Sequence, residues 1–210
     1  MNHGLYAIVD VGTLRARGAN VTDFARRLLD AGALAAMQLR AKGSSAADTL
    51  ALARALQPMC ASAGVPFYVN DRADIALLAA ATGVHVGQDD LPVDAVRRAT
   101  PSLSVGLSTH TAAEFAAGVG TGAAYLAVGP VFETATKADA APVVGLDALA
   151  ARVRDAKGSP VVAIGGITLA RAPLVREAGA RAGAVIGALV VDDASVTSTA
   201  RALHRALGGA

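Results

Sequence analysis

Cysteine is almost absent from this chain, since Cys60 is the single one. One thiol cannot form an internal disulfide, so the sequence fits a protein of a reducing cytoplasm. Cys60 falls in an expected helix, where a small buried core residue is a more common role than a nucleophile. The sequence therefore argues against both a disulfide framework and cysteine chemistry.

Aromatic residues are also scarce, at 3% with no tryptophan, although 53% of the chain is hydrophobic. The core must therefore be built from alanine, valine, leucine and isoleucine. This composition suits buried parallel strands covered by closely packed, alanine-rich helices.

Linkers, charge runs and low-complexity tracts are missing, so we expect one domain over residues 1–210. The net charge of +2 comes from scattered arginines, and the lack of a basic cluster argues against a nucleic-acid partner. The uncharged stretch Phe115–Phe132 is interrupted by glycines and Pro130, which argues against a membrane span. The N-terminus lacks a basic region before its apolar run, so a signal peptide is not expected. A homo-oligomer is compatible with the sequence, which does not fix the number of subunits.

Short β-rich runs alternate with longer amphipathic stretches along the whole chain. The expected strands are Leu5–Val9, Ala35–Arg40, Pro66–Val69, Gly83–Gly87, Ser104–Ser108, Ala124–Gly129, Pro160–Gly165 and Gly183–Leu189. The expected helices are Thr22–Ala31, Ser45–Ala63, Asp74–Ala81, Val93–Ala99, Thr111–Ala117, Leu146–Ala156, Leu169–Ala178 and Ala194–Leu207. Strict alternation of this kind predicts an α/β fold, a single-domain (β/α)8 TIM barrel. An open doubly wound sheet is the alternative, but no G-x-G-x-x-G follows the first strand.

Acidic residues follow two successive expected strands, Asp71 after one and Asp89-Asp90 after the next. Parallel neighbouring strands bring such residues to one edge of a sheet. Two hard oxygen donors at that edge indicate a divalent cation, Mg²⁺ most naturally, together with a phosphorylated ligand. The alternative is that Asp71 caps a helix and the other two are solvated loop charges.

Cations, glycines and histidines also gather at the expected strand ends, where a barrel of this type carries its chemistry. Strand alternation puts Gln38, Arg40 and, if the strand extends so far, Lys42 on one face, which would suit phosphate oxygens better than a solvated rim. Gly165-Gly166 and Gly187 match the usual phosphate site of the fold, although a glycine pair also serves as a plain turn. His85 and His110 are more simply explained as satisfied core or rim histidines than as acid–base groups.

The order and spacing of several motifs make the chain resemble the thiamine phosphate synthase family over nearly its whole length. The matching stretches are LYAIVD, QLRAK, VNDRADIAL, GVHVGQDDLP, VGLSTHT, GPVFETATK, VVGL and AIGGIT. The resemblance implies a diphosphate-releasing transferase, which joins a pyrimidinylmethyl diphosphate to a thiazole phosphate with Mg²⁺ as cofactor.

The resemblance also implies roles for individual residues. Mg²⁺ would be held by Asp71 and Asp90. Contacts to the pyrimidine diphosphate would come from the QLRAK motif, Gln38, Leu39, Arg40, Ala41 and Lys42, and from Asn70, Ser108 and Lys137; Arg40, Lys42, Ser108 and Lys137 would be catalytic. The thiazole phosphate would lie among Thr134, Ala135, Thr136, Gly166, Ile186 and Gly187.

The chain departs from the family pattern at Ala41, Glu133 and Gly187, where the family usually has Glu, Pro and Ser. Ala41 should point away from the diphosphate site, whereas Glu133 could alter closure of its loop and Gly187 removes a hydroxyl contact. A related thiazole tautomerase, a non-catalytic regulatory barrel and a sugar-phosphate isomerase are the alternatives. The tautomerase would have no use for a diphosphate-binding metal, and the isomerase would require a Glu/His pair that is not evident.

Overall fold

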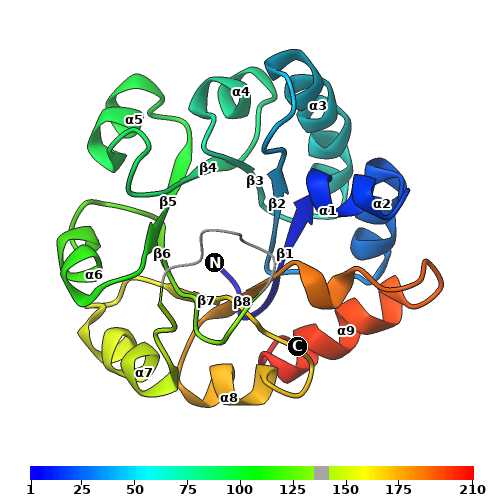
Figure 1. Ribbon diagram of the computed structural model, residues 1–210. Helices are drawn as coiled ribbons and strands as arrows, with labels where there is room; N and C mark the ends of the chain where they lie inside the picture. Colours follow the sequence, from blue (N-terminus) through cyan, green and yellow to red (C-terminus); the bar gives the residue numbers. More distant parts are fainter. Residues whose placement is uncertain (135–141) are drawn as a thin grey trace.

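The protein is a closed ring of eight parallel strands surrounded by helices, and Figure 1 looks along the axis of this ring. The computed structural model describes residues 1–134 and 142–210. Strand order in the barrel follows chain order from β1 to β8, and β8 closes the ring against β1. The predicted (β/α)8 architecture is therefore confirmed, and the open doubly wound sheet is wrong.

The elements follow one another with short connections. The strands are β1 (Gly4–Asp10), β2 (Ala36–Arg40), β3 (Phe67–Asn70), β4 (Gly83–Val86), β5 (Ser104–Thr109), β6 (Tyr125–Val128), β7 (Val161–Ile164) and β8 (Ala182–Val185). The helices are α1 (Val11–Ala16), α2 (Val21–Asp30), α3 (Ala46–Ser62), α4 (Ala73–Leu78), α5 (Val93–Ala99), α6 (Ala112–Gly118), α7 (Leu146–Asp155), α8 (Ala172–Glu177) and α9 (Val196–Ala206), with a 3₁₀ helix η1 (Gly187–Leu189).

Most element bounds lie within three residues of the expected ones, and two differences are larger. The last strand ends at Val185 rather than Leu189, and the apolar run continues as η1, where Leu189 is buried. Hydrophobicity alone does not separate a buried strand from a buried 3₁₀ turn. The short helix α1 was not expected; Asp10 caps it by accepting a hydrogen bond from the Thr13 backbone N–H.

Alternation along the strands divides the apolar side chains into two layers. One cluster, which includes Leu39 and Cys60, packs between the strands and the helices. The other fills the barrel and contains all three tyrosines, Tyr6, Tyr68 and Tyr125. The three rings contact one another, with centroids 5.5–5.9 Å apart.

Glycines on β4 and β5 make room for these rings. A Cβ on Gly83 would lie 2.7 Å from Cε1 of Tyr68, and one on Gly106 would overlap the Tyr125 ring. The two positions therefore carry no side chain because the tyrosine rings of the neighbouring strands β3 and β6 occupy the space beside them.

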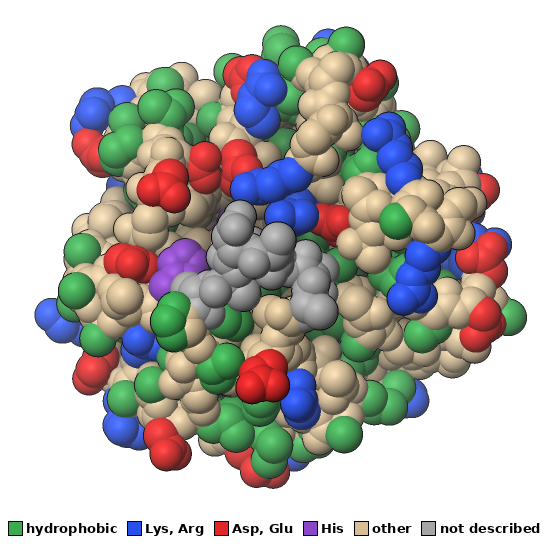
Figure 2. Space-filling model, viewed as in Figure 1, with side chains coloured by type: hydrophobic (Ala, Val, Ile, Leu, Met, Phe, Trp, Pro, Cys, Tyr) green, Lys and Arg blue, Asp and Glu red, His purple; other side chains and the backbone are tan. Residues whose placement is uncertain are grey.

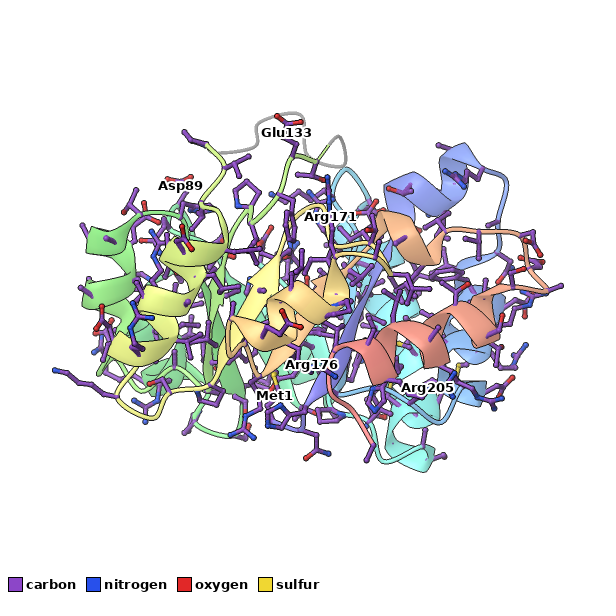
Figure 3. All side chains as sticks on the ribbon, turned by 90° about the horizontal axis from the view of Figure 1, so that it is seen from below. Met1, Asp89, Glu133, Arg171, Arg176 and Arg205 are labelled. Atoms are coloured by element: carbon purple, nitrogen blue, oxygen red, sulfur yellow. The ribbon has the colours of Figure 1, made fainter. Side chains whose placement is uncertain are left out.

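The loops after the strands form one face of the molecule. Figure 3 places Asp89 of the β4–α5 loop and Glu133 of the β6–α7 loop at the same end of the barrel, with Met1 at the opposite end. This is the end at which (β/α)8 barrels carry their functional groups. Within the described residues, none of the helices is long and apolar enough to cross a membrane.

Candidate active site

The acidic pair predicted from the sequence does come together beyond β3 and β4. Asp71 and Asp90 interact through their side chains. Burial and the negative charge of Asp90 raise the pKa of Asp71, and the nearby Lys42 ammonium opposes this rise. The Lys42 Nζ lies 3.6 Å from the Asp71 Oδ2. Two carboxylates and one cation thus share a small space after three successive strands.

Local backbone geometry directs both carboxylates to this place. Asp71 has a φ of 63°, in the left-handed region that aspartate tolerates better than most residues. Its backbone N–H donates to the His85 carbonyl across to β4 at 2.8 Å. The Asp90 Oδ2 accepts from the Gly87 N–H at 2.7 Å, which folds the loop back over the end of β4. Asp89 beside it is exposed, so Asp90 is the acidic residue of this loop that lies against Asp71.

The pair has the donor chemistry that Mg²⁺ requires. Magnesium commonly takes one or two carboxylates and completes its octahedron with water and substrate phosphate oxygens. The pKa of Asp71 is raised first by burial and then by the like charge of Asp90, and a bound cation would favour the ionised form of both carboxylates. Among residues 1–134 and 142–210 there is no group of three or more His, Cys, Asp or Glu residues that could enclose a metal. Two carboxylates would leave most of the coordination of such an ion to water and phosphate oxygens.

Arg40 is held at the end of β2 by a partner that the sequence analysis missed. Its Nη1 forms an ion pair with the Asp10 Oδ2 at the end of the neighbouring strand β1. The other Asp10 oxygen accepts from the Thr13 N–H and Oγ1, each at 2.8 Å. Burial opposes ionisation of Asp10, but these Thr13 bonds and Arg40 hold its pKa below the ordinary value. Asp10 directly follows the apolar run of the first strand, so the strand-end argument could have found it.

The rest of the QLRAK motif follows the expected alternation only in part. Gln38 points into the barrel, where its Nε2 donates to the Tyr6 hydroxyl at 3.0 Å. Leu39 and Ala41 pack in the outer layer, so their side chains face away from the mouth of the barrel. Strand β2 ends at Arg40, and Lys42 lies beyond it with an exposed side chain.

Ser108 and Asn70 lie at the mouth beside this cluster. Asn70 is the last residue of β3 and is half-buried. The Ser108 Oγ lies 2.8 Å from the His85 Nε2, and its carbonyl accepts from the Gln88 Nε2 at 2.6 Å. His85 is thus a satisfied, buried histidine, as its sequence context indicated. His110 contacts Glu114 at 3.2 Å one helical turn away, a pair that the sequence analysis did not recognise.

Basic and acidic side chains lie next to each other near the centre of this face, over the β2–β4 part of the ring (Figure 2). Five residues that interact with one another through ion pairs or like charges form this charged cluster: Asp10, Arg40, Lys42, Asp71 and Asp90. Alternating charges of this kind suit a ligand that carries both a phosphate group and a metal ion.

The expected thiazole phosphate subsite lies on the β7–β8 side. Gly166 has a φ of 64°, and a Cβ there would lie 2.8 Å from the Phe132 Cβ, so this glycine is required by the β6–α7 loop that packs on it. Arg171 connects the β7–α8 loop, which contains Gly166, with the β6–α7 loop, which contains Phe132. Its Nη1 donates to the Gly166 carbonyl at 2.8 Å, and its guanidinium lies 4.8 Å from the centre of the Phe132 ring. Ile186 is half-buried, and Gly187 begins η1.

Part of the predicted site lies outside the described residues. These positions are Ala135, Thr136 and Lys137. Thr134, the last described residue of that loop, is half-buried.

A closed parallel barrel with charged residues at the carboxyl ends of its strands places the chain in the class of (β/α)8 enzyme folds. The family model described as thiamine monophosphate synthase matches residues 5–189. The chain therefore belongs to the thiamine monophosphate synthase family.

Individual relatives agree with this assignment. The chain is 44% identical over 203 residues to the thiamine-phosphate synthase of Chloroflexus aurantiacus, covering 95% of this chain and 90% of that protein. It is 45% identical over 204 residues to the thiamine-phosphate synthase of Methanocella arvoryzae, covering 97% and 94%. The solved thiamine phosphate pyrophosphorylase of Pyrococcus furiosus superimposes with a TM-score of 0.87 at 31% identity, covering 97% and 95%.

Proposed function

We propose that this protein is a thiamine phosphate synthase. It would join 4-amino-2-methyl-5-(diphosphooxymethyl)pyrimidine to 4-methyl-5-(2-phosphooxyethyl)thiazole with release of diphosphate, or to its 2-carboxy form with release of diphosphate and carbon dioxide. The family membership supports this reaction, and so do the names of relatives that span nearly the whole chain. The observation that carries the proposal is the grouping of Lys42, Asp71 and Asp90 beyond three successive strands.

The chemistry requires stabilisation of a leaving diphosphate. The C–O bond to the exocyclic methylene breaks, electrons from the pyrimidine amino group support that carbon, and the thiazole nitrogen then forms the new C–N bond. Arg40 would bind phosphate oxygens with its fork of N–H donors, and Lys42 would contribute a point charge. Mg²⁺ held by Asp71 and Asp90 would neutralise charge on the departing group. Positioning and electrostatics carry this scheme, so it needs no strong base.

The remaining assignments are part of the same proposal. Asn70, Ser108 and Lys137 would contact the pyrimidine diphosphate, and Gln38 would face it from inside the barrel. Any contact from Leu39 or Ala41 would come through the backbone, because their side chains pack outward. Thr134, Ala135, Thr136, Gly166, Ile186 and Gly187 would surround the thiazole phosphate.

The same proposal extends to where the protein works and in what form. It would act in the cytoplasm, where Cys60 stays reduced, as a single chain or a homo-oligomer. Burial raises the pKa of Cys60 to about 12, which agrees with a core thiol rather than a nucleophile.

The test is the reaction of the purified protein with both substrates, in Mg²⁺ and then in EDTA. We expect thiamine phosphate and diphosphate in equal amounts, and little of either in EDTA. A folded protein that binds both substrates without product would identify a regulatory relative. Rearrangement of a thiazole without diphosphate release would instead identify a tautomerase.

A further inference from the structure

A chain of hydrogen bonds crosses the interior of the barrel and ends at the candidate active site. The Gln38 Nε2 donates to the Tyr6 hydroxyl at 3.0 Å, and this hydroxyl lies 2.8 Å from that of Tyr125. The Tyr125 hydroxyl lies 2.8 Å from the His85 Nδ1, and the His85 Nε2 lies 2.8 Å from the Ser108 Oγ. Five strands contribute one residue each, and only Ser108 reaches the mouth of the barrel.

The inner members of the chain are buried, so their polar hydrogens must be donated to other members of the chain. Tyr6 and Tyr125 are each 1% exposed, Gln38 is 3% exposed and His85 is 7% exposed. A buried donor without an acceptor costs about 1–3 kcal/mol, so such groups are paired in native proteins. Burial raises the pKa of both tyrosines, so each keeps its single hydroxyl hydrogen.

These conditions fix the direction of the chain. The Gln38 Nε2 only donates, so the Tyr6 oxygen accepts from it. Within the described residues, the other polar atom recorded at the Tyr6 hydroxyl is the Tyr125 hydroxyl, so the Tyr6 hydrogen must go there. The Gln38 amide also interacts with the Tyr125 hydroxyl, and because this interaction lowers the pKa of Tyr125 it is one in which the amide donates. The Tyr125 oxygen therefore accepts from Tyr6 and Gln38, and its own hydrogen goes to the His85 Nδ1.

The hydrogen bond from Tyr125 decides which nitrogen of His85 carries the proton. A Nδ1 atom that accepts a hydrogen bond carries no proton, so the neutral ring carries its proton on Nε2 and donates it to the Ser108 Oγ. Because the Ser108 oxygen accepts from His85, the hydroxyl hydrogen of Ser108 is not donated to His85 and is available at the mouth of the barrel.

We infer that Tyr6 and Tyr125 are positioning residues, which hold His85 in its Nε2–H tautomer and thereby present Ser108 as a hydrogen-bond donor at the mouth of the barrel. The group that Ser108 would meet is an acceptor atom of the bound substrate. The part of this inference that concerns the substrate rests on the proposed function, whereas the direction of the chain does not.

The direction is tested by the ¹⁵N NMR signals of the His85 ring in the labelled protein, assigned with His85→Gln. We expect a protonated Nε2 and a bare Nδ1. Tyr125→Phe keeps the ring but removes the donor to Nδ1, so the proton should redistribute between the two nitrogens. Tyr68→Phe is the matched control, since its ring packs in the same cluster and its hydroxyl contacts Ser104 outside the chain. A proton on Nδ1 in the wild type would overturn the inference, whether or not the protein turns over substrate.

The link to Ser108 is tested by a double-mutant cycle in the synthase assay. Tyr125→Phe should lower kcat about tenfold, and Tyr68→Phe should change it less than twofold. In a Ser108→Ala background, Tyr125→Phe should have little further effect, because the two residues act as one unit. An equal loss in both backgrounds would show that Tyr125 acts only through stability.

Discussion

Asp10 ends the first strand and begins the first helix, and both roles use its carboxylate. One oxygen caps α1 through Thr13, and the other pairs with Arg40. The side chain of Asp10 is 6% exposed and that of Arg40 is 16% exposed, so this pair is shielded from water. A shielded pair of this kind orients a guanidinium more firmly than the surface pairs of this protein can.

Asp10→Asn separates these two roles, because asparagine still caps a helix but carries no charge. We expect a loss of about 1–3 kcal/mol in the free energy of unfolding, measured in urea, because Arg40 loses its charged partner. Turnover should fall roughly tenfold, since a loosely held Arg40 positions the diphosphate poorly.

Asp23→Asn is the control for this change, because Asp23 pairs with Arg26 on the exposed surface of α2. It should change stability by less than about 0.5 kcal/mol. Equal effects of the two substitutions would contradict the role given to Asp10.

Among the elements, β5 needs a glycine, Gly106, at the position where it faces the Tyr125 ring. Tyr125 of β6 reaches past Gly106 to His85 of β4, and its ring occupies the space that a side chain at Gly106 would need. β5 therefore contributes Ser108 to the hydrogen-bond chain and, at Gly106, leaves room for the Tyr125 ring.

Gly106→Ala should destabilise the protein by about 1–3 kcal/mol, because the methyl group overpacks the barrel interior. Thermal unfolding followed by circular dichroism measures this loss. Gly12→Ala in α1 is the control: its Cβ would meet nothing nearer than the Asp10 Oδ1 at 3.5 Å, and alanine favours a helix. A stable Gly106→Ala protein with unchanged turnover would mean that the ring is placed differently.

For the molecule as a whole, the first strand and the last helix are in contact at the N-terminal end of the barrel. His204 of α9 accepts a hydrogen bond from the Leu5 N–H at 3.3 Å, and it is 7% exposed. Burial lowers the pKa of His204 below its ordinary value. The unfolded chain therefore binds a proton at a higher pH than the folded protein does.

The sign of the pH dependence follows from this difference. The contribution of His204 to stability is complete above its unfolded pKa of about 6.5 and is lost as the pH falls towards its folded pKa. Wild-type protein should therefore lose more Tm between pH 7.5 and pH 5.5 than His204→Gln, which still offers an acceptor to Leu5 but does not titrate. The same loss in both proteins would contradict the assignment.

Much of the fold could be predicted from the sequence, because alternation between strand and helix patterns repeats along the whole chain. The strand-end argument also brought Asp71 and Asp90 to one place. It failed where a residue works through the barrel interior: Tyr6 and Tyr125 are far apart in sequence and look like ordinary core residues of β1 and β6. Partners such as Asp10 and Arg40 depend on strand register, which periodicity alone does not give.

The most direct test of the account is the Mg²⁺ dependence of turnover in Asp90→Asn, compared with Asp89→Asn in the same loop. Asp90 is held against Gly87 and interacts with Asp71, whereas Asp89 is exposed. We predict that Asp90→Asn loses most of its turnover and requires much more Mg²⁺, while Asp89→Asn behaves like the wild type. Unchanged Mg²⁺ dependence in Asp90→Asn would contradict the metal site on which the proposed function depends.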